Sequence, residues 1–167
     1  QCEVLLRGSS VRIVTVIGFP HGNTWSKIKA LEARTAVECG AQEIDMVIKL
    51  GALCAGFYTD VENDIRHVVE AVPHASVKVI LETCYLQNRQ IAEACLIAER
   101  AGAAYVKTST GFGSRGASIE DIECMQKTLT GRLKIKASGG IRTYQQAVSL
   151  LTAGASRLGT SQSVAII

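Results

Sequence analysis

The chain has 167 residues, enough to bury one sizeable core, and no linker or low-complexity stretch divides it, so we expect residues 1–167 to form a single domain. Its net charge of +3 comes from scattered basic residues, which argues against nucleic acid and against a membrane surface as partners. The composition is 47% hydrophobic but only 5% aromatic, with 15 glycines, and is typical of helices packed over short aliphatic strands.

Short apolar runs with β character alternate with longer segments of helical periodicity along the chain. The predicted strands cover residues 11–18, 43–48, 77–82, 104–108, 133–137 and 157–159. The predicted helices cover residues 25–39, 60–72, 88–101, 119–129 and 144–153. This β/α alternation predicts an α/β fold with a parallel sheet.

Three of the predicted helices end in a Gly-Ala pair just before the next strand. The glycines are Gly40, Gly102 and Gly154. Glycine adopts the left-handed conformation that commonly terminates a helix, so the three pairs mark equivalent corners of one architecture. Ser118, with Asp121 three residues later, predicts a capping box at the start of the helix 119–129.

The six cysteines lie far apart, with no C-x-x-C pair and no nearby histidines that would complete a zinc site. We therefore expect buried free thiols in a reducing, cytoplasmic setting, and no metal centre. No apolar run is long enough to span a bilayer.

Two lysines, Lys107 and Lys136, each end a short apolar run and precede a Gly/Ser/Thr loop. They lie about one β/α unit apart, so in a parallel sheet both would sit at the carboxyl ends of adjacent strands. At roughly 6 Å and an effective dielectric of about 20, their repulsion is on the order of 3 kcal/mol, or about two pKa units. One of the two amines could therefore be a nucleophile near neutral pH, whereas two solvated strand-end charges are the alternative.

Two β/α architectures compete, a doubly wound sheet and a TIM (β/α)8 barrel. A nucleotide-binding sheet would use the glycines at positions 111, 113 and 116, which follow a strand and precede a helix. The acidic residue expected at the end of the next strand is missing, because that strand reads LKIKASGG. The sequence therefore favours the barrel, with these glycines forming a turn.

In a barrel the phosphate site is usually made by the last two βα loops. Here those loops are residues 138–142 and 159–161, which include Gly139, Gly140, Gly159, Thr160 and Ser161. Glycines let backbone N–H groups approach an anion, and hydroxyls add donors. A phosphorylated ligand is expected, although Gly139-Gly140 alone would fit a plain tight turn equally well.

Six strings in this sequence closely resemble the deoxyribose-phosphate aldolase family, in the family's order and spacing. They are IGFPHG at 17–22, EIDMVI at 43–48, KVILET at 78–83, KTSTGF at 107–112, KASGGIRT at 136–143 and RLGTS at 157–161. The likeness runs from about Ser10 to the end. No single string is decisive, but six in sequence are very specific.

The resemblance implies a class I aldolase on a (β/α)8 barrel that reversibly cleaves 2-deoxy-D-ribose 5-phosphate to D-glyceraldehyde 3-phosphate and acetaldehyde, with no cofactor. By position in the family's motifs, Lys107 forms the Schiff base, Lys136 is the second lysine and Asp45 relays protons. The family's phosphate loops fall on Gly111, Gly139, Gly140, Gly159, Thr160 and Ser161.

The chemistry of these residues agrees with the roles that the resemblance implies. A protonated imine on a lysine withdraws electrons from the bond to be broken, without help from a metal. A group must also move the proton of the hydroxyl at the scissile carbon, and Asp45, acting through a water, fits that role. Alternation along residues 44–48 places Asp45 opposite its apolar neighbours, so it should face the barrel interior rather than solvent. Lys78 and Glu82 share a strand face and could pair there or lie at the surface.

The family barrel has eight strands, whereas this chain offers about six, so we expect an incomplete barrel whose first two strands would precede Gln1. The outermost predicted strands would then keep unpaired edges, and open edges favour association, so a homo-oligomer is among the expected states. An inactive or weakened aldolase is expected from such a chain. The alternatives are a truncated, non-catalytic sugar-phosphate-binding barrel fragment and another lysine-dependent aldolase with a different sugar phosphate.

Overall fold

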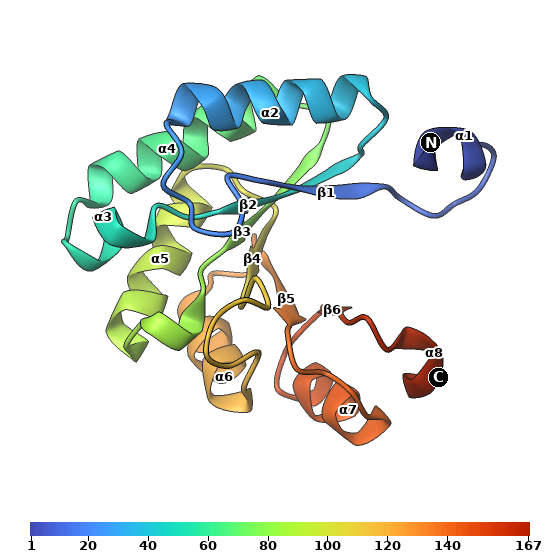
Figure 1. The fold of residues 1–167 in the computed structure, drawn as a ribbon. Helices are drawn as coiled ribbons and strands as arrows, with labels where there is room; N and C mark the ends of the chain where they lie inside the picture. The colour runs from blue at the N-terminus through green and yellow to red at the C-terminus, as the bar shows by residue number, and fades with distance from the viewer.

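Six short parallel strands form the centre of the computed structural model, which describes all 167 residues (Figure 1). The strands pair in chain order, and each neighbouring pair is parallel. They are β1 (Val14–Ile17), β2 (Glu43–Val47), β3 (Ser76–Ile80), β4 (Tyr105–Lys107), β5 (Lys134–Ser138) and β6 (Arg157–Gly159). β1 and β6 do not pair with each other, so the sheet is an open half-barrel with two free edges.

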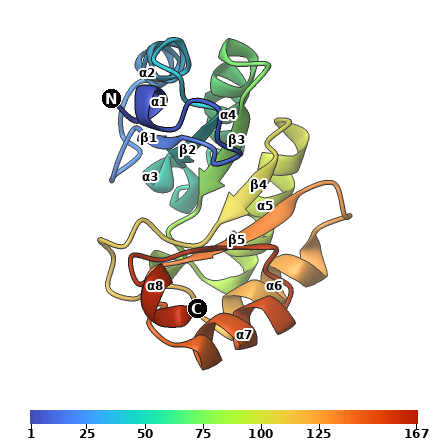
Figure 2. The same cartoon turned by 90° about the vertical axis from the view of Figure 1, so that its right-hand side faces the viewer.

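Helices connect the strands and cover the convex side of the sheet (Figures 1 and 2). The long ones are α2 (Ser26–Glu38), α4 (Tyr58–Ala71), α5 (Asn88–Arg100), α6 (Ile119–Thr128) and α7 (Tyr144–Thr152). The short ones are α1 (Cys2–Leu5), α3 (Leu50–Cys54), the 3-10 turn η1 (Thr83–Tyr85) and α8 (Ser163–Ile166). The predicted α/β fold with about six strands of an incomplete TIM barrel is confirmed. None of the helices is long and apolar enough to cross a membrane.

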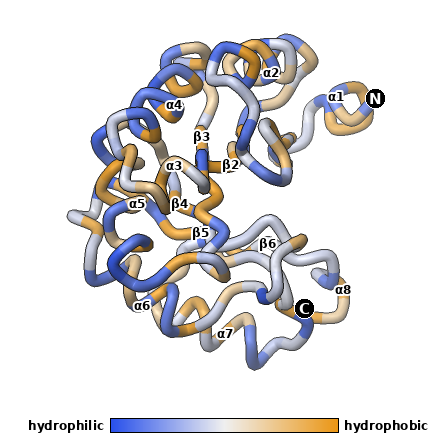
Figure 3. Tube along the Cα trace, turned by 60° about the vertical axis from the view of Figure 1, so that its left-hand side comes forward, coloured by the Kyte–Doolittle hydropathy of each residue, from blue (hydrophilic) through white to orange (hydrophobic).

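Strand alternation divides the sheet into an apolar face and a polar face. On β2, for example, Ile44 and Met46 belong to the hydrophobic core under the helices, whereas Glu43 and Asp45 lie on the opposite, concave face. The helices carry the matching pattern, with hydrophobic and hydrophilic residues alternating within each turn (Figure 3). The core is therefore one layer between sheet and helices, and the concave face is left for polar groups.

Backbone geometry explains where several elements end. The three predicted helix-terminating glycines all have positive φ, at 99° for Gly40, 84° for Gly102 and 121° for Gly154. Ser118 caps α6 by accepting a hydrogen bond from the Asp121 amide at 3.2 Å. The reciprocal half of the predicted capping box is absent, because the Asp121 carboxylate bonds Thr83 and Arg115 instead.

The expectation of buried thiols is wrong for most of the cysteines. All six are free, but only Cys95 is buried, and Cys84 and Cys124 are partly exposed. The other three, Cys2, Cys39 and Cys54, are exposed. Cys39 directly follows α2 and Cys54 is the last residue of α3, and at a helix end periodicity does not require burial.

Candidate active site

The concave face carries a network of charged side chains that come from neighbouring strands. Asp45 on β2 binds the Lys78 Nζ through Oδ1 at 2.9 Å. Its other oxygen, Oδ2, accepts hydrogen bonds from the Lys107 Nζ and the Lys136 Nζ, each at 2.8 Å. Register explains this convergence, because Lys107 and Lys136 are directly paired on β4 and β5 while Asp45 is paired with Lys78. Three ammonium groups thus share one buried carboxylate.

The electrostatics of the network follow from this geometry. Burial acts to raise the pKa of Asp45, but the ammonium groups of Lys107 and Lys136 outweigh it and lower the pKa to about 2. The pKa of Lys136 lies below its ordinary value, first because the side chain is desolvated and further because Lys107 and Lys78 are nearby, although Asp45 opposes the shift. Asp45 is therefore a carboxylate at neutral pH.

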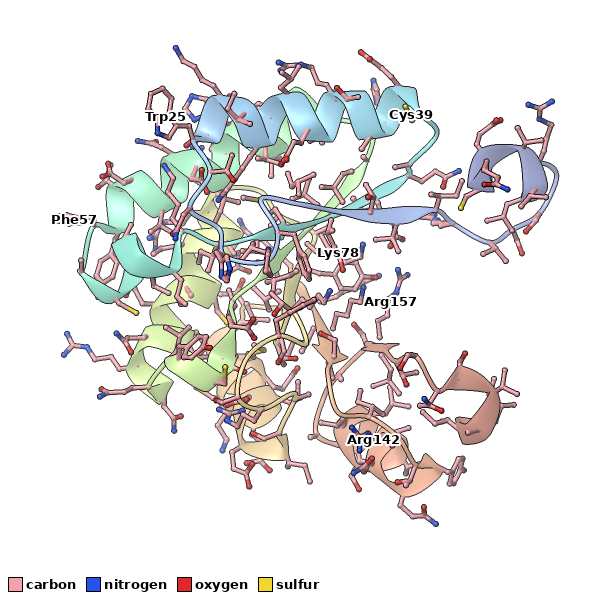
Figure 4. The ribbon with its side chains drawn as sticks, in the orientation of Figure 1. Trp25, Cys39, Phe57, Lys78, Arg142 and Arg157 are labelled. Carbon is pink, nitrogen blue, oxygen red and sulfur yellow. The ribbon has the colours of Figure 1, made fainter.

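A second carboxylate extends the network toward the amino ends of the strands. Glu43 Oε2 lies 2.7 Å from the Lys78 Nζ and 2.6 Å from Arg157 Nη1, and Oε1 lies 3.5 Å from Arg12 Nη1. Figure 4 shows Lys78 and Arg157 on the open side of the sheet. The ring of Tyr105 lies beneath Lys78 and Arg157, 5.9 Å and 5.3 Å from its centroid. Cations outnumber carboxylates on this face.

Sequence reasoning missed part of this network and misplaced another part. The suggested Lys78–Glu82 pair does not form, because Lys78 binds the two β2 carboxylates and Glu82 lies beyond the end of β3 and bonds Thr110. Glu43 was missed, although it lies two residues before Asp45 on β2 and so faces the same side of the sheet. That alternation could have identified it. Arg157 was missed because its strand has only three residues and shows no alternation of its own.

A cleft of about 500 Å3 opens beside Lys107 and Lys136. Its wall includes all six of the residues predicted to hold phosphate, together with Thr110 and Arg142, which sequence reasoning did not single out. The six residues are Gly111, Gly139, Gly140, Gly159, Thr160 and Ser161. Gly139 and Gly140 both have positive φ, at 85° and 75°, so this turn requires glycine and presents backbone rather than side chains to the cleft.

Hydrogen bonds hold the loops after β4 and β5 against each other. The Thr108 hydroxyl donates to the Ser138 carbonyl at 3.0 Å and accepts from the Ser138 amide at 3.0 Å. The Ser138 hydroxyl donates to the Ser109 carbonyl at 2.7 Å. Gly116 packs so closely on the Gly139 carbonyl that a Cβ could not be accommodated. The cleft is therefore built on a rigid base.

Comparisons with known proteins agree with this site. Residues 2–163 match the family model described as DeoC/LacD family aldolase. A protein of Carboxydothermus hydrogenoformans named deoxyribose-phosphate aldolase is 51% identical over 167 residues, which cover 98% of this chain and 73% of that protein.

Two solved structures match closely. A putative deoxyribose-phosphate aldolase from Coccidioides immitis is 44% identical with a TM-score of 0.94, and the match covers 97% of this chain and 65% of that one. The deoxyribose phosphate aldolase of Aeropyrum pernix, described as a unique tetrameric structure, is 34% identical with a TM-score of 0.89, covering 98% of this chain and 70% of that one. The chain therefore belongs to the DeoC/LacD family of aldolases.

Proposed function

We propose that this chain is a class I aldolase that reversibly cleaves 2-deoxy-D-ribose 5-phosphate to D-glyceraldehyde 3-phosphate and acetaldehyde. The observation that carries the proposal is the shared Asp45 oxygen, which holds Lys107 and Lys136 side by side at the mouth of a glycine-rich cleft. Relatives named deoxyribose-phosphate aldolase, about 50% identical over nearly the whole chain, support it.

Lys107 is the proposed nucleophile. After its amine has given up a proton, the nitrogen adds to the C1 aldehyde of the open-chain sugar, and loss of water leaves a protonated imine. A base then removes the proton of the C3 hydroxyl, the C2–C3 bond breaks, and its electrons pass to the imine to give an enamine. The three carbons that carry the phosphate leave as glyceraldehyde 3-phosphate. Protonation of the enamine and hydrolysis of the resulting imine release acetaldehyde.

Asp45 has two proposed tasks in this sequence. Because its pKa is about 2, it stays ionised and stabilises the cationic imine that forms on Lys107. It also orients a water that relays protons between the C3 hydroxyl and the enamine carbon. Lys136, whose pKa is lowered by burial and by its cationic neighbours, is placed to share these proton transfers from the other side of the same oxygen.

The cleft supplies the binding energy for the phosphate end of the substrate. Two consecutive glycines, Gly139 and Gly140, allow the anion to approach backbone N–H groups, while Gly111 and Gly159 keep the cleft open next to the lysines. Hydroxyls from Thr160 and Ser161 line the same space. An anchored phosphate holds the sugar carbonyl near Lys107, and such positioning lowers the barrier to imine formation.

Borohydride trapping tests the proposal. Incubation with 2-deoxyribose 5-phosphate and borohydride should attach the substrate carbon to Lys107, and peptide mass mapping locates the label. A Lys107→Ala variant should remain unlabelled, and Lys134→Ala, which removes an exposed lysine of β5, should label normally. Label on Lys136 in the unmodified chain would show that the two lysines have exchanged roles.

A second function, binding of a sugar phosphate without turnover, is favoured by one observation. The sheet ends at β1 and β6 with unpaired edges, so nothing in this structure faces Lys107 from the opposite side of a closed barrel. This function predicts that the sugar phosphate raises the melting temperature while borohydride fixes no label. Aldehyde release measured beside a longer relative separates the two, since comparable rates would exclude a pure binding role.

A further inference from the structure

Glu82 adopts a backbone conformation that no other non-glycine residue of this protein adopts. Its φ and ψ are 55° and 62°, in the left-handed region, directly after β3. The residue is only 4% exposed. Strained conformations of this kind persist where the surroundings hold them in place and gather at functional sites. The mechanism described above does not use this residue.

The carboxylate of Glu82 has an unusual set of partners. Its two oxygens each lie 3.3 Å from the Thr110 amide nitrogen, and Oε2 also accepts the Thr110 hydroxyl. It is paired with no lysine or arginine, although buried carboxylates are ordinarily neutralised by a cation. The charge of Glu82 is therefore compensated chiefly by donors of a single residue on the loop after β4.

The same loop returns to Glu82 a second time. The Thr110 hydroxyl oxygen accepts the Phe112 amide at 3.0 Å, which closes a turn around Gly111. Beyond that turn, a Cβ placed on Gly113 would lie 3.2 Å from Glu82 Oε1 and would collide with the Cys84 sulfur. Glu82 thus contacts the loop on both sides of Gly111, whose φ is 97°.

This loop forms one wall of the phosphate cleft. Thr110 and Gly111 line the cleft three and four residues after Lys107. The wall opposite has bonds of its own, since the Thr160 hydroxyl donates to the Ile141 carbonyl at 2.8 Å, and it meets the loop after β4 at its base, where the Ser138 hydroxyl donates to the Ser109 carbonyl. Among the side-chain hydrogen bonds to Thr110, those to Glu82 are the ones that reach a different loop, the one after β3.

We propose that Glu82 is a positioning residue for phosphate recognition, which rests on the proposed function. By holding Thr110 and Gly111, it fixes the near wall of the cleft and with it the distance between bound phosphate and the Lys107 amine. The strained backbone is what directs the carboxylate from the end of β3 across to the loop after β4.

Calorimetric titration of the full chain with inorganic phosphate tests this role without requiring turnover. Glu82→Gly suits the test, because glycine accepts the left-handed backbone while losing the carboxylate. We expect the phosphate Kd to rise about tenfold in Glu82→Gly and in Thr110→Val, the effect of losing one or two hydrogen bonds. The double variant should be no weaker than Glu82→Gly alone, since Thr110→Val removes the hydroxyl part of a link that Glu82→Gly removes entirely. Glu123→Gln, on an exposed glutamate of α6, is the matched control.

A second readout separates positioning from general loop disorder. Borohydride trapping with acetaldehyde, which has no phosphate, should be unchanged in Glu82→Gly, whereas trapping with 2-deoxyribose 5-phosphate at limiting concentration should fall. An unchanged phosphate Kd in Glu82→Gly, additive losses in the double variant, or an equal loss of acetaldehyde trapping would each overturn the assignment. The chain could bind phosphate in a way that needs Glu82 and yet trap no aldehyde. That result would support the role of Glu82 and would overturn the aldolase proposal.

Discussion

Asp45 holds the concave face together, because three ammonium groups meet its two oxygens where all four side chains are largely buried. Its side chain is about 3% exposed, and those of Lys107 and Lys136 are each 10% exposed. Unpaired charges at this depth would be costly, so the carboxylate is required for stability. Stability and the proposed catalysis therefore depend on the same ionised group.

The free energy of unfolding at acidic pH should depend on the ionisation of Asp45. An aspartate whose pKa falls from 3.8 to about 2 on folding contributes stability that is complete above pH 3.8 and is lost as the pH falls through 2. The contribution is about 2 kcal/mol. Urea unfolding at a series of pH values should show the advantage of the unmodified chain over Asp45→Asn shrinking by about this amount between pH 6 and pH 2. An exposed carboxylate, Asp60, changed to asparagine should give no such trend.

Ser109 offers a contrasting prediction. Its hydroxyl is buried without a hydrogen-bond partner, whereas the neighbouring Ser138 hydroxyl donates to the Ser109 carbonyl. Ser109→Ala should therefore leave the free energy of unfolding unchanged or raise it by up to about 1 kcal/mol, while Ser138→Ala should lower it by about 1 kcal/mol. Denaturant titration of both variants checks the pair. A larger loss in Ser109→Ala than in Ser138→Ala would contradict the structure.

For single residues, the sequence predicted positions well where the alternation of side chains along a strand decides which way they face. Alternation on β2 predicted that Asp45 faces inward, and the spacing of Lys107 and Lys136 predicted that they are neighbours. The partner of Glu82 could not be predicted, because its direction depends on a left-handed backbone that no non-glycine residue signals in advance. Contacts that depend on such backbone geometry can be identified only from the three-dimensional structure.

Among the elements, α7 has the most completely capped start. Thr143 accepts the Gln146 amide at 3.2 Å, and the Gln146 side chain accepts the Thr143 amide at 3.2 Å and the Arg142 amide at 2.8 Å. These bonds fix the helix directly after the loop of Gly139 and Gly140. The cap therefore joins helix stability to the shape of the cleft.

Removing this cap should have a defined cost. Thr143→Ala should lower the free energy of unfolding by about 1 kcal/mol, whereas Thr143→Ser keeps the hydroxyl and should cost far less. Thermal or urea unfolding of the two variants provides the comparison. Equal losses in both would show that the methyl group of Thr143, rather than its hydroxyl, is what matters.

The limits of prediction at the element scale have physical causes. Helices with a full apolar stripe were predicted within a few residues of their bounds, because periodicity over three turns is a strong signal. The short helices α3 and α8 were not predicted, since four or five residues contain little more than one period. The first strand begins at Val14 rather than at residue 11, because its ladder to β2, the only strand beside it, begins with Val14 opposite Glu43.

At the scale of the whole molecule, the two open edges are the dominant feature. β1 exposes Val14 and Val16, by 45% and 42%, on the concave side of its unpaired edge. At the other end of the sheet, Val164 of α8 is 93% exposed. The strand order and the incomplete barrel were predictable from the β/α alternation, whereas the exposure of these particular side chains follows from how the sheet curves.

Free strand edges of this kind favour association. Sedimentation velocity at rising concentration should therefore show self-association of the unmodified chain, and Val16→Lys should reduce it, because an edge lysine disfavours strand pairing. Ile119→Lys, at a similarly exposed position on α6, is the control. A chain that stays monomeric throughout the micromolar range would contradict this expectation.

The excess of cations on the concave face also affects how a ligand arrives. Since that face opens to solvent, its positive potential extends outward and attracts a doubly charged anion before any contact is made. Long-range attraction of this kind is screened within about 10 Å at 0.1 M salt. Capture of a phosphate ester should accordingly slow as ionic strength rises, while its escape, governed by short-range bonds in the cleft, changes little.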